Sequence, residues 1–288
     1  MDTEPSFLRG LYLKSRAVVG VEPLPEERLG ILGPDPADTQ DLLKSPQDGE
    51  PKPINLLHKY FSRGPYGDRF QIRDQGRTNR CGGFAGRAGA LLMTRKLEVL
   101  SGKDKPWQGD YSSNEIYWNA RLDPTRDSGV YMRDLMKSLH KDGVCSAAYW
   151  QDHENLFRRP SEIEGASRYF IPGYERLSTG HKASAAEFVQ VLSVEELPIF
   201  IGATMFKYVS DNALKHRGLF QMPKSNDPTI GGHAMLIVGW LSSGGKKVFI
   251  LVNSWGHKVG DRGIFYMPED YVSERLVTDA WTLPANTF

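Results

Sequence analysis

The sequence contains very little cysteine. Cys81 and Cys145 are the only two cysteines among 288 residues, too few for the disulfide framework on which many small secreted domains depend. A reducing compartment is therefore the simplest interpretation of the cysteine content. Free cysteine is among the most buried residue types, so we expect Cys145 to be a small buried core residue.

The sequence also lacks an excess of charge of one sign. Its formal net charge is +1, from 36 basic and 35 acidic residues, so electrostatics gives no reason to expect a nucleic acid or an anionic membrane as partner. Residues 1–5 are partly acidic, and no long apolar run follows them, which is unlike a secretory signal or a membrane span. We expect a cytoplasmic protein, or one exported without the general secretory signal.

Composition divides the chain near residue 53. Residues 1–53 are rich in proline and acidic residues, especially over 34–38 and 45–53, and such segments form little regular structure. Core-like sequence begins at Ile54, and 40% of the whole chain is hydrophobic. We expect an N-terminal extension over 1–53, propeptide-like or regulatory, followed by a folded domain over 54–288.

Hydrophobic periodicity predicts a helix over 81–96 with one inward-facing stripe. Each of its glycines costs roughly 0.5–1 kcal/mol relative to alanine. We therefore expect other elements to pack closely against this helix and to offset the cost. The glycines concerned are Gly82, Gly83, Gly86 and Gly89.

Two further helices are predicted in the same half of the chain. Ser112 and Glu115 have the spacing of a capping box, in which each side chain bonds the other residue's backbone N–H, and this predicts a helix start. Another helix is predicted over about 131–140, ended by Gly143.

After about residue 185 the pattern changes to short β-rich runs bounded by glycine. We predict strands at 198–202, 234–240, 247–252 and 263–267. Helices first and strands later imply an α+β protein in two lobes. The mainly helical lobe is expected over about 75–185, and an antiparallel β-barrel-like lobe over about 186–288.

Cys81, His233 and Asn253 supply a nucleophile, a base and an orienting group, in that chain order. A thiol attacks as the thiolate, an imidazole can hold its proton, and a side-chain amide can hold the imidazole ring in place. Cys81 lies in the first turn of its predicted helix, where exposed N–H groups favour a negative charge. The sequence therefore predicts acyl transfer through Cys81.

A predicted hairpin brings His233 and Asn253 together. Residues 242–245 can connect the second and third predicted strands, and pairing about the centre of this turn makes opposed residue numbers sum to about 487. Asn253 then lies opposite Ala234 and beside His233. In this arrangement the amide oxygen of Asn253 can accept a ring N–H from the histidine.

This order of residues resembles the papain-like cysteine peptidases, and in particular bacterial-type members built without disulfides. The resemblance covers about residues 54–285 and includes Gln75, six residues before Cys81. It implies a papain-like two-lobe fold with the active site in the cleft between the lobes. It also implies peptide-bond hydrolysis through an acyl-enzyme on Cys81, with His233 as acid and base and Asn253 as orienter, without metal or cofactor.

The resemblance gives roles to two more residues. Gln75 corresponds to the glutamine of the oxyanion hole, and Trp255 to the tryptophan that covers the His–Asn hydrogen bond. Three positions depart from the pattern: Gly82 replaces tryptophan, Arg80 replaces serine, and Val259 stands where a second tryptophan is common. Arg80 could turn inward and add positive potential at the thiol, but a surface position is our expectation.

Substrate-binding residues follow from the same resemblance. Gly129 matches the glycine strip that binds substrate backbone as an added β-strand. Tyr131, Ala234 and Gly202 would line the second specificity pocket. Because Gly202 is small, this pocket is expected to accept a bulky apolar or aromatic side chain.

Three functions remain open at this point. The first is an endopeptidase with a protein or peptide substrate, in which the N-terminal segment occupies the cleft in cis and restrains activity. The second is a different Cys–His–Asn acyl-transfer enzyme, such as a deamidase or a transglutaminase-like effector, which would lack the features at Gln75 and Gly129. The third is a non-catalytic peptide-binding module, which would have no reason to retain Cys81, His233, Asn253 and Gln75 together.

Overall fold

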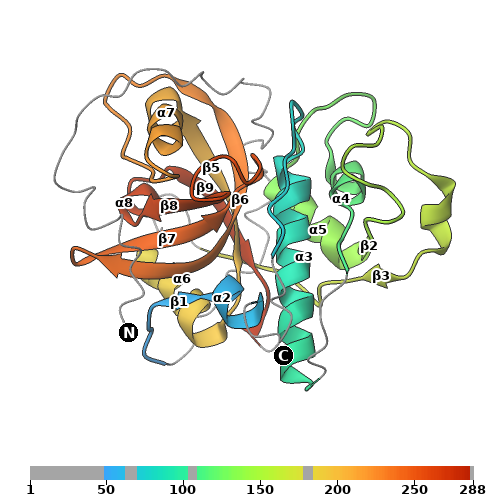
Figure 1. Ribbon diagram of the computed structural model, residues 1–288, viewed down its shortest axis with the longest axis horizontal. Helices are drawn as coiled ribbons and strands as arrows, with labels where there is room; N and C mark the ends of the chain where they lie inside the picture. Colours follow the sequence, from blue (N-terminus) through green and yellow to red (C-terminus); the bar gives the residue numbers. More distant parts are fainter. Residues whose placement is uncertain (1–48, 62–69, 103–108, 178–183, 286–288) are drawn as a thin grey trace.

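The computed structural model describes residues 49–61, 70–102, 109–177 and 184–285. A sheet-containing lobe and a smaller helical lobe lie on either side of one long helix, α3 (Figure 1). The prediction of an α+β fold in two lobes is confirmed. The helical elements are α2 (Leu56–Phe61), α3 (Cys81–Leu100), α4 (Ser113–Ala120), α5 (Met132–Lys141), η3 (Ser161–Gly165), α6 (Ala185–Gln190), η5 (Val191–Glu195), α7 (Lys207–Lys215) and α8 (Asp270–Ser273).

The larger lobe is built on a seven-stranded sheet. Six of its strands follow the order β4-β9-β5-β6-β7-β8, and the seventh, β1, pairs with β6. All of these pairs are antiparallel, as predicted. The sequence did not predict β9, which lies between β4 and β5. The strands are β1 (Ile54–Asn55), β4 (Glu175–Arg176), β5 (Ile199–Phe206), β6 (Thr229–Ser243), β7 (Lys246–Val252), β8 (Ile264–Pro268) and β9 (Val277–Thr282), and the short pair β2 (Val144–Cys145) and β3 (Arg168–Tyr169) belongs to the helical lobe.

Helix α3 contacts both lobes, and its glycines allow the close approach. A Cβ atom at Gly83 would lie 2.4 Å from the carbonyl oxygen of Ser113 in α4, and one at Gly89 would lie 2.2 Å from the ring of Phe200 in β5. Real Cβ atoms do not come so close to neighbouring atoms, so alanine at either position would require the neighbour to move. The expected close packing is confirmed, although the helix continues to Leu100 rather than ending near 96.

Only half of the predicted capping box forms. The Ser112 hydroxyl accepts a hydrogen bond from the Glu115 N–H at 3.1 Å, which caps α4. The Glu115 carboxylate does not return the bond. It accepts from the Cys145 N–H at 2.7 Å and forms an ion pair with Arg168 at 2.6 Å. The reciprocal bond was predicted wrongly because Glu115 is fully buried against partners that lie far along the chain.

The hairpin between β6 and β7 is tighter than predicted. Ser243 pairs with Lys246, so opposed residue numbers sum to 489 near the turn and to 488 beyond a bulge between Ile237 and Gly239. The predicted sum of 487 was wrong because only Gly244 and Gly245 form the turn. Their φ values of 58° and 80° suit the two-residue turn that fits the twist of a hairpin.

Residues 49–53, grouped by composition with the N-terminal extension, contact the larger lobe. The carbonyl of Gly49 accepts from the Gln190 side chain at 3.2 Å, and that of Lys52 accepts from the Ser193 hydroxyl at 2.7 Å. Strand β1 then pairs Ile54 with Trp240 of β6. Residues 1–48 lie outside the described residues.

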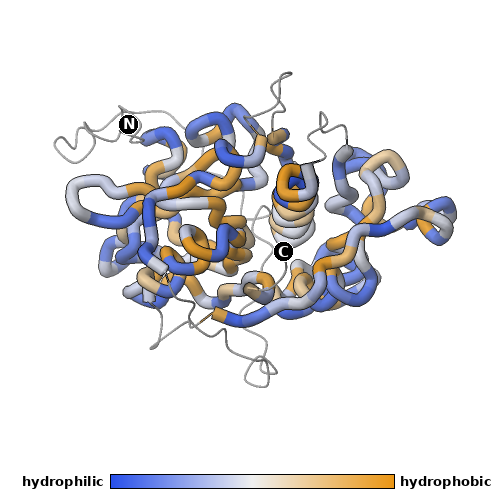
Figure 2. Tube along the Cα trace, turned by 90° about the horizontal axis from the view of Figure 1, so that it is seen from below, coloured by the Kyte–Doolittle hydropathy of each residue, from blue (hydrophilic) through white to orange (hydrophobic). Residues whose placement is uncertain are grey.

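Hydrophobic positions gather inside the larger lobe and along α3, with hydrophilic positions on the outer turns (Figure 2). The main core joins buried side chains of both lobes, among them Phe200 of β5 and Leu135 of α5. A second small cluster of Cys145, Trp150 and Ile163 lies in the helical lobe, so Cys145 is a buried core residue as expected. Within the described ranges, none of the helices is both long enough and apolar enough to cross a bilayer.

Candidate active site

Cys81 is the first residue of α3, and its sulfur faces the β lobe. The Sγ atom accepts a hydrogen bond from the Ala234 N–H of β6 at 3.4 Å. No side chain caps this helix end, and the positive end of the helix dipole lies at the residue that carries the sulfur. This environment suits a thiolate nucleophile.

His233 lies next to Ala234 in β6, and Asn253 follows the last residue of β7. The His233 Nε2 and Asn253 Oδ1 atoms are 2.8 Å apart, and the Ser254 N–H donates to the same Oδ1 at 2.7 Å. An amide oxygen only accepts, so Nε2 carries the hydrogen of the His–Asn pair. Nδ1 is then the ring nitrogen suited to exchange a proton with Cys81.

Trp255 covers this pair. Its ring stacks on the His233 ring at 4.8 Å with an interplanar angle of 28°, and the Phe265 ring packs edge-on with it at 5.5 Å. Trp255 is only 1% exposed. An apolar cover of this kind keeps water from competing for the His–Asn hydrogen bond.

Gln75 is brought to the site by pairing between two distant segments. The Gln75 N–H donates to the carbonyl of Ser254 at 2.8 Å, and the Gly256 N–H donates to the carbonyl of Arg73 at 3.1 Å. The Gln75 side-chain oxygen accepts from the Ser254 hydroxyl at 2.5 Å. Its amide nitrogen donates to the carbonyl of Thr78 at 2.6 Å, which uses one of the two amide hydrogens.

An ion-pair cluster fixes the segment before Gln75 on α3. Asp110 accepts two hydrogen bonds from Arg87 of α3, at 2.6 and 2.8 Å, and a third from Arg73 at 2.6 Å. Arg87 also donates to the carbonyl of Gln71 at 3.1 Å. Bidentate arginine–carboxylate pairs are strong and directional, so the position of the loop relative to Cys81 is well defined.

Arg80 is not at the surface, and that expectation was wrong. It is 6% exposed, and its side chain turns into the helical lobe toward Asn114 and the carbonyl of Asp152. Burial lowers the pKa of Arg80, while the charges of Asp152 and Asp127 act in the opposite direction. These partners could not be predicted from the sequence, because they lie 34 and 72 residues away from Arg80.

Gly129 uses its own backbone groups inside the helical lobe. Its N–H donates to the Tyr117 hydroxyl at 3.0 Å, and its carbonyl accepts from the Leu122 N–H at 3.4 Å. Its φ of +76° favours glycine. Arg121 and Val130 are opposite each other in an antiparallel bridge. In such a pair successive residues direct their backbone groups to opposite sides, and Gly129 bonds Leu122, so the N–H and C=O of Val130 face away from Leu122. Sequence reasoning did not single out Val130.

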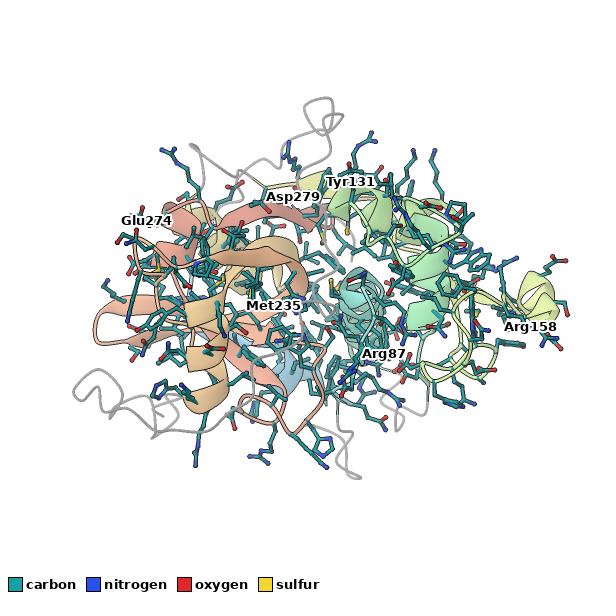
Figure 3. All side chains as sticks on the ribbon, turned by 90° about the horizontal axis from the view of Figure 1, so that it is seen from above. Arg87, Tyr131, Arg158, Met235, Glu274 and Asp279 are labelled. Carbon is teal, nitrogen blue, oxygen red and sulfur yellow. The ribbon has the colours of Figure 1, made fainter. Side chains whose placement is uncertain are left out.

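The remaining expected substrate-binding residues are divided between the lobes. Gly202 of β5 is the direct partner of Ala234 of β6, so these two lie side by side. Tyr131 is half-buried and precedes α5 in the helical lobe. Figure 3 shows Tyr131 at the boundary of the lobes, on the side where Asp279 of β9 also lies. Val259, at the position where the resemblance would place a second tryptophan, is partly buried against the core.

An open cavity of about 630 Å³ adjoins the loop between Gln75 and Cys81. Its walls are the loop itself, Asp127 and the segment 152–157. In the part of the chain that the structure describes, no group of three or more His, Cys, Asp or Glu side chains is arranged to hold a metal ion.

Comparison with known proteins identifies the family of this chain. The family model of the papain family of cysteine proteases matches residues 128–281 of this chain. An uncharacterized peptidase C1-like protein of Acanthamoeba polyphaga mimivirus is 31% identical over 178 residues, 58% of this chain, and the match spans 57% of the length of that relative.

Solved structures share the fold. The crystal structure of xylellain, a cysteine protease from Xylella fastidiosa, is 28% identical, with a TM-score of 0.73 over 93% of this chain and 99% of that chain. Procathepsin B of Trypanosoma congolense is 12% identical, with a TM-score of 0.64 over 90% of this chain and 87% of that chain. Since the family match extends over more than half of the sequence, this chain belongs to the papain family of cysteine proteases.

Proposed function

We propose that this chain is a thiol-dependent endopeptidase in which Cys81 is the nucleophile, His233 the acid and base, and Asn253 the orienter. The observation that carries the proposal is the 2.8 Å pair between His233 Nε2 and Asn253 Oδ1, next to an Ala234 N–H that contacts the Cys81 sulfur. A nucleophile, a base and an orienting group in this arrangement are what acyl transfer requires.

In the first half of the proposed reaction the Cys81 thiolate attacks the carbonyl carbon of the substrate peptide. The carbonyl oxygen becomes an oxyanion, which the Cys81 N–H and the Gln75 amide would stabilise. The C–N bond then breaks, and protonated His233 gives its proton to the leaving amine. In the second half His233 takes a proton from water, hydroxide attacks the thioester, and the acid product leaves as the Cys81 thiolate is restored.

Substrate backbone would pair with the strip at Val130. Both backbone groups of Gly129 are already used inside the lobe, whereas those of Val130 face the other way. We therefore assign Gly129 the role of setting the left-handed turn that presents Val130 to an added substrate strand. Tyr131, Gly202 and Ala234 would flank the adjoining side-chain pocket, for which a bulky apolar or aromatic residue is expected.

Labelling and product analysis test this function. An epoxide inhibitor selective for papain-like thiols is expected to modify the peptide that contains Cys81, and incubation with a protein substrate is expected to yield new N-termini. A deamidase would instead release ammonia from glutamine without breaking the chain, and a transglutaminase-like enzyme would attach an added amine. A binding module would retain peptides unchanged. Mass spectrometry of the products separates these four outcomes, and only cleavage supports the proposal.

We also propose that part of the N-terminal segment restrains the enzyme in cis. That segment lies outside the described residues, except for 49–53. Two observations support the proposal: Cys81 and His233 are both buried, and a proenzyme, procathepsin B, is among the similar structures.

A chain that begins at Gly49 tests this restraint, because it keeps the contacts of Gly49 and Lys52 with the larger lobe. We expect this shortened chain to show a higher kcat/KM on a small peptide and faster labelling of Cys81 than the full chain. A shortened Cys81→Ala variant controls for contaminating peptidases. Equal rates in both assays would show that the N-terminal segment has no inhibitory role.

A further inference from the structure

The Arg80 side chain joins three segments at the active site. Its Nε donates to the Thr78 hydroxyl at 2.9 Å, and its Nη2 lies 3.4 Å from the carbonyl of Gln75. Its Nη1 donates to Asn114 Oδ1 in α4 and to the carbonyl of Asp152 at 3.0 Å. One buried guanidinium thus ties both ends of the Gln75–Thr78 turn to the helical lobe.

The same turn determines where the Gln75 amide lies. The Thr78 hydroxyl donates to the Gln75 carbonyl at 2.6 Å, and the Gln75 amide donates to the Thr78 carbonyl at 2.6 Å. Arg80 donates directly to the Thr78 hydroxyl. A displacement of Thr78 would therefore move the Gln75 amide, and a misplacement of about 1 Å can cost a hundredfold in rate.

The partners of Arg80 are themselves held in place. Asn114 donates to the carbonyl of Gln151 at 2.7 Å, which turns its oxygen toward Arg80. The Ser113 hydroxyl donates to the Asp152 carboxylate at 2.5 Å. Arg80 therefore connects the Gln75 turn to α4 and to the segment that follows Trp150, which are hydrogen-bonded to each other.

We propose that Arg80 is a positioning residue of the oxyanion site, which acts through Thr78 on the Gln75 amide. The proposal rests on the proposed peptidase function. Lysine cannot replace arginine here, because a single ammonium group cannot bridge the separate acceptors on Thr78, Asn114 and Asp152 that the planar guanidinium spans.

Arg80→Lys is expected to lower kcat for a peptide substrate roughly tenfold to a hundredfold, with little change in KM. Alkylation of Cys81 by iodoacetamide should stay within about twofold of wild type across pH, because this displacement forms no oxyanion. Arg158→Lys is the matched control: Arg158 is exposed and lies at the outer edge of the helical lobe (Figure 3), and this variant should behave as wild type.

A double-mutant comparison tests the route through Gln75. If Arg80 acts through the Gln75 amide, Gln75→Ala combined with Arg80→Lys should be little slower than Gln75→Ala alone. If the two single-variant losses of kcat instead multiply in the double variant, the proposal is overturned. A parallel fall in iodoacetamide alkylation would also overturn it, because Arg80 would then act on the thiol or on the whole fold.

Thr78→Val provides a second test that leaves Arg80 in place. It removes the hydroxyl that links the guanidinium to the Gln75 carbonyl, so the same loss of kcat with unchanged alkylation is expected even if Arg80→Lys does not fold. Wild-type kcat in both Thr78→Val and Arg80→Lys would refute the positioning role of Arg80 and leave the proposed peptidase function in place. A wild-type chain that cleaves no peptide would instead refute the proposed function.

Discussion

Replacing Cys81 with alanine is expected to lower peptide hydrolysis roughly 10⁴-fold or more, because the acyl-enzyme cannot form without the sulfur. The fold should persist. Cys81 is buried, but removal of one sulfur atom from a core position costs about 1 kcal/mol of unfolding free energy. Activity on a fluorogenic peptide, measured beside a thermal melt, separates loss of chemistry from loss of structure.

Cys145→Ser is the matched control for this experiment. Burial, together with the nearby Glu115 carboxylate, raises the pKa of Cys145 to about 12, so this thiol stays protonated and unreactive at neutral pH. We expect one rapidly alkylated thiol per chain, at Cys81, and near-normal turnover for Cys145→Ser. Full activity of Cys81→Ala, or loss of activity only in Cys145→Ser, would show that the nucleophile has been assigned wrongly.

The arrangement of Cys81, His233 and Asn253 could be predicted from sequence because each follows from a local pattern. A helix start places Cys81 at an N-terminus, and two consecutive strands joined by a short glycine turn place His233 near Asn253. The hairpin register was wrong by one to two residues, yet His233 and Asn253 still meet. Asn253 lies just beyond β7, where it can reach His233 without a strict register.

Partners far along the chain could not be predicted. Glu115 has the spacing of a capping box, but its carboxylate bonds Cys145 and Arg168. Arg80 was expected at the surface, whereas its guanidinium is buried and reaches Asn114 and the carbonyl of Asp152, which lie far along the chain. A local pattern shows which bonds a side chain can make, whereas burial against distant segments decides which bond forms.

The same limit applies to the substrate strip. Sequence reasoning selected Gly129 because glycine allows close approach of another chain. The structure shows a different reason for glycine: its φ is positive, and both of its backbone groups are bonded within the lobe. The sequence around a glycine does not distinguish these two reasons, because both require a residue without a Cβ atom.

Gln75→Ala is expected to lower kcat roughly 10²–10³-fold with little change in KM, as removal of one oxyanion-hole donor does elsewhere. The substitution has a second effect that must be separated, because the Gln75 oxygen also accepts from the Ser254 hydroxyl at 2.5 Å, next to Asn253. Ser254→Ala removes that contact and retains the amide, so it should lose less than about tenfold. Gln75→Glu keeps an acceptor for the Ser254 hydroxyl but removes the amide N–H donor, so its kcat should fall as much as that of Gln75→Ala.

Inhibition by a peptide aldehyde shows whether this loss belongs to the oxyanion. An aldehyde adds to the Cys81 sulfur and forms a tetrahedral adduct whose oxygen lies where the oxyanion of the reaction would lie. If the Gln75 amide donates to that oxygen, its removal should weaken aldehyde binding by about the same factor as kcat, while a peptide that is not cleaved binds as before. A loss confined to KM, with aldehyde affinity unchanged, would make Gln75 a turn residue that connects Ser254 to the loop, and the oxyanion would then depend on the Cys81 N–H alone.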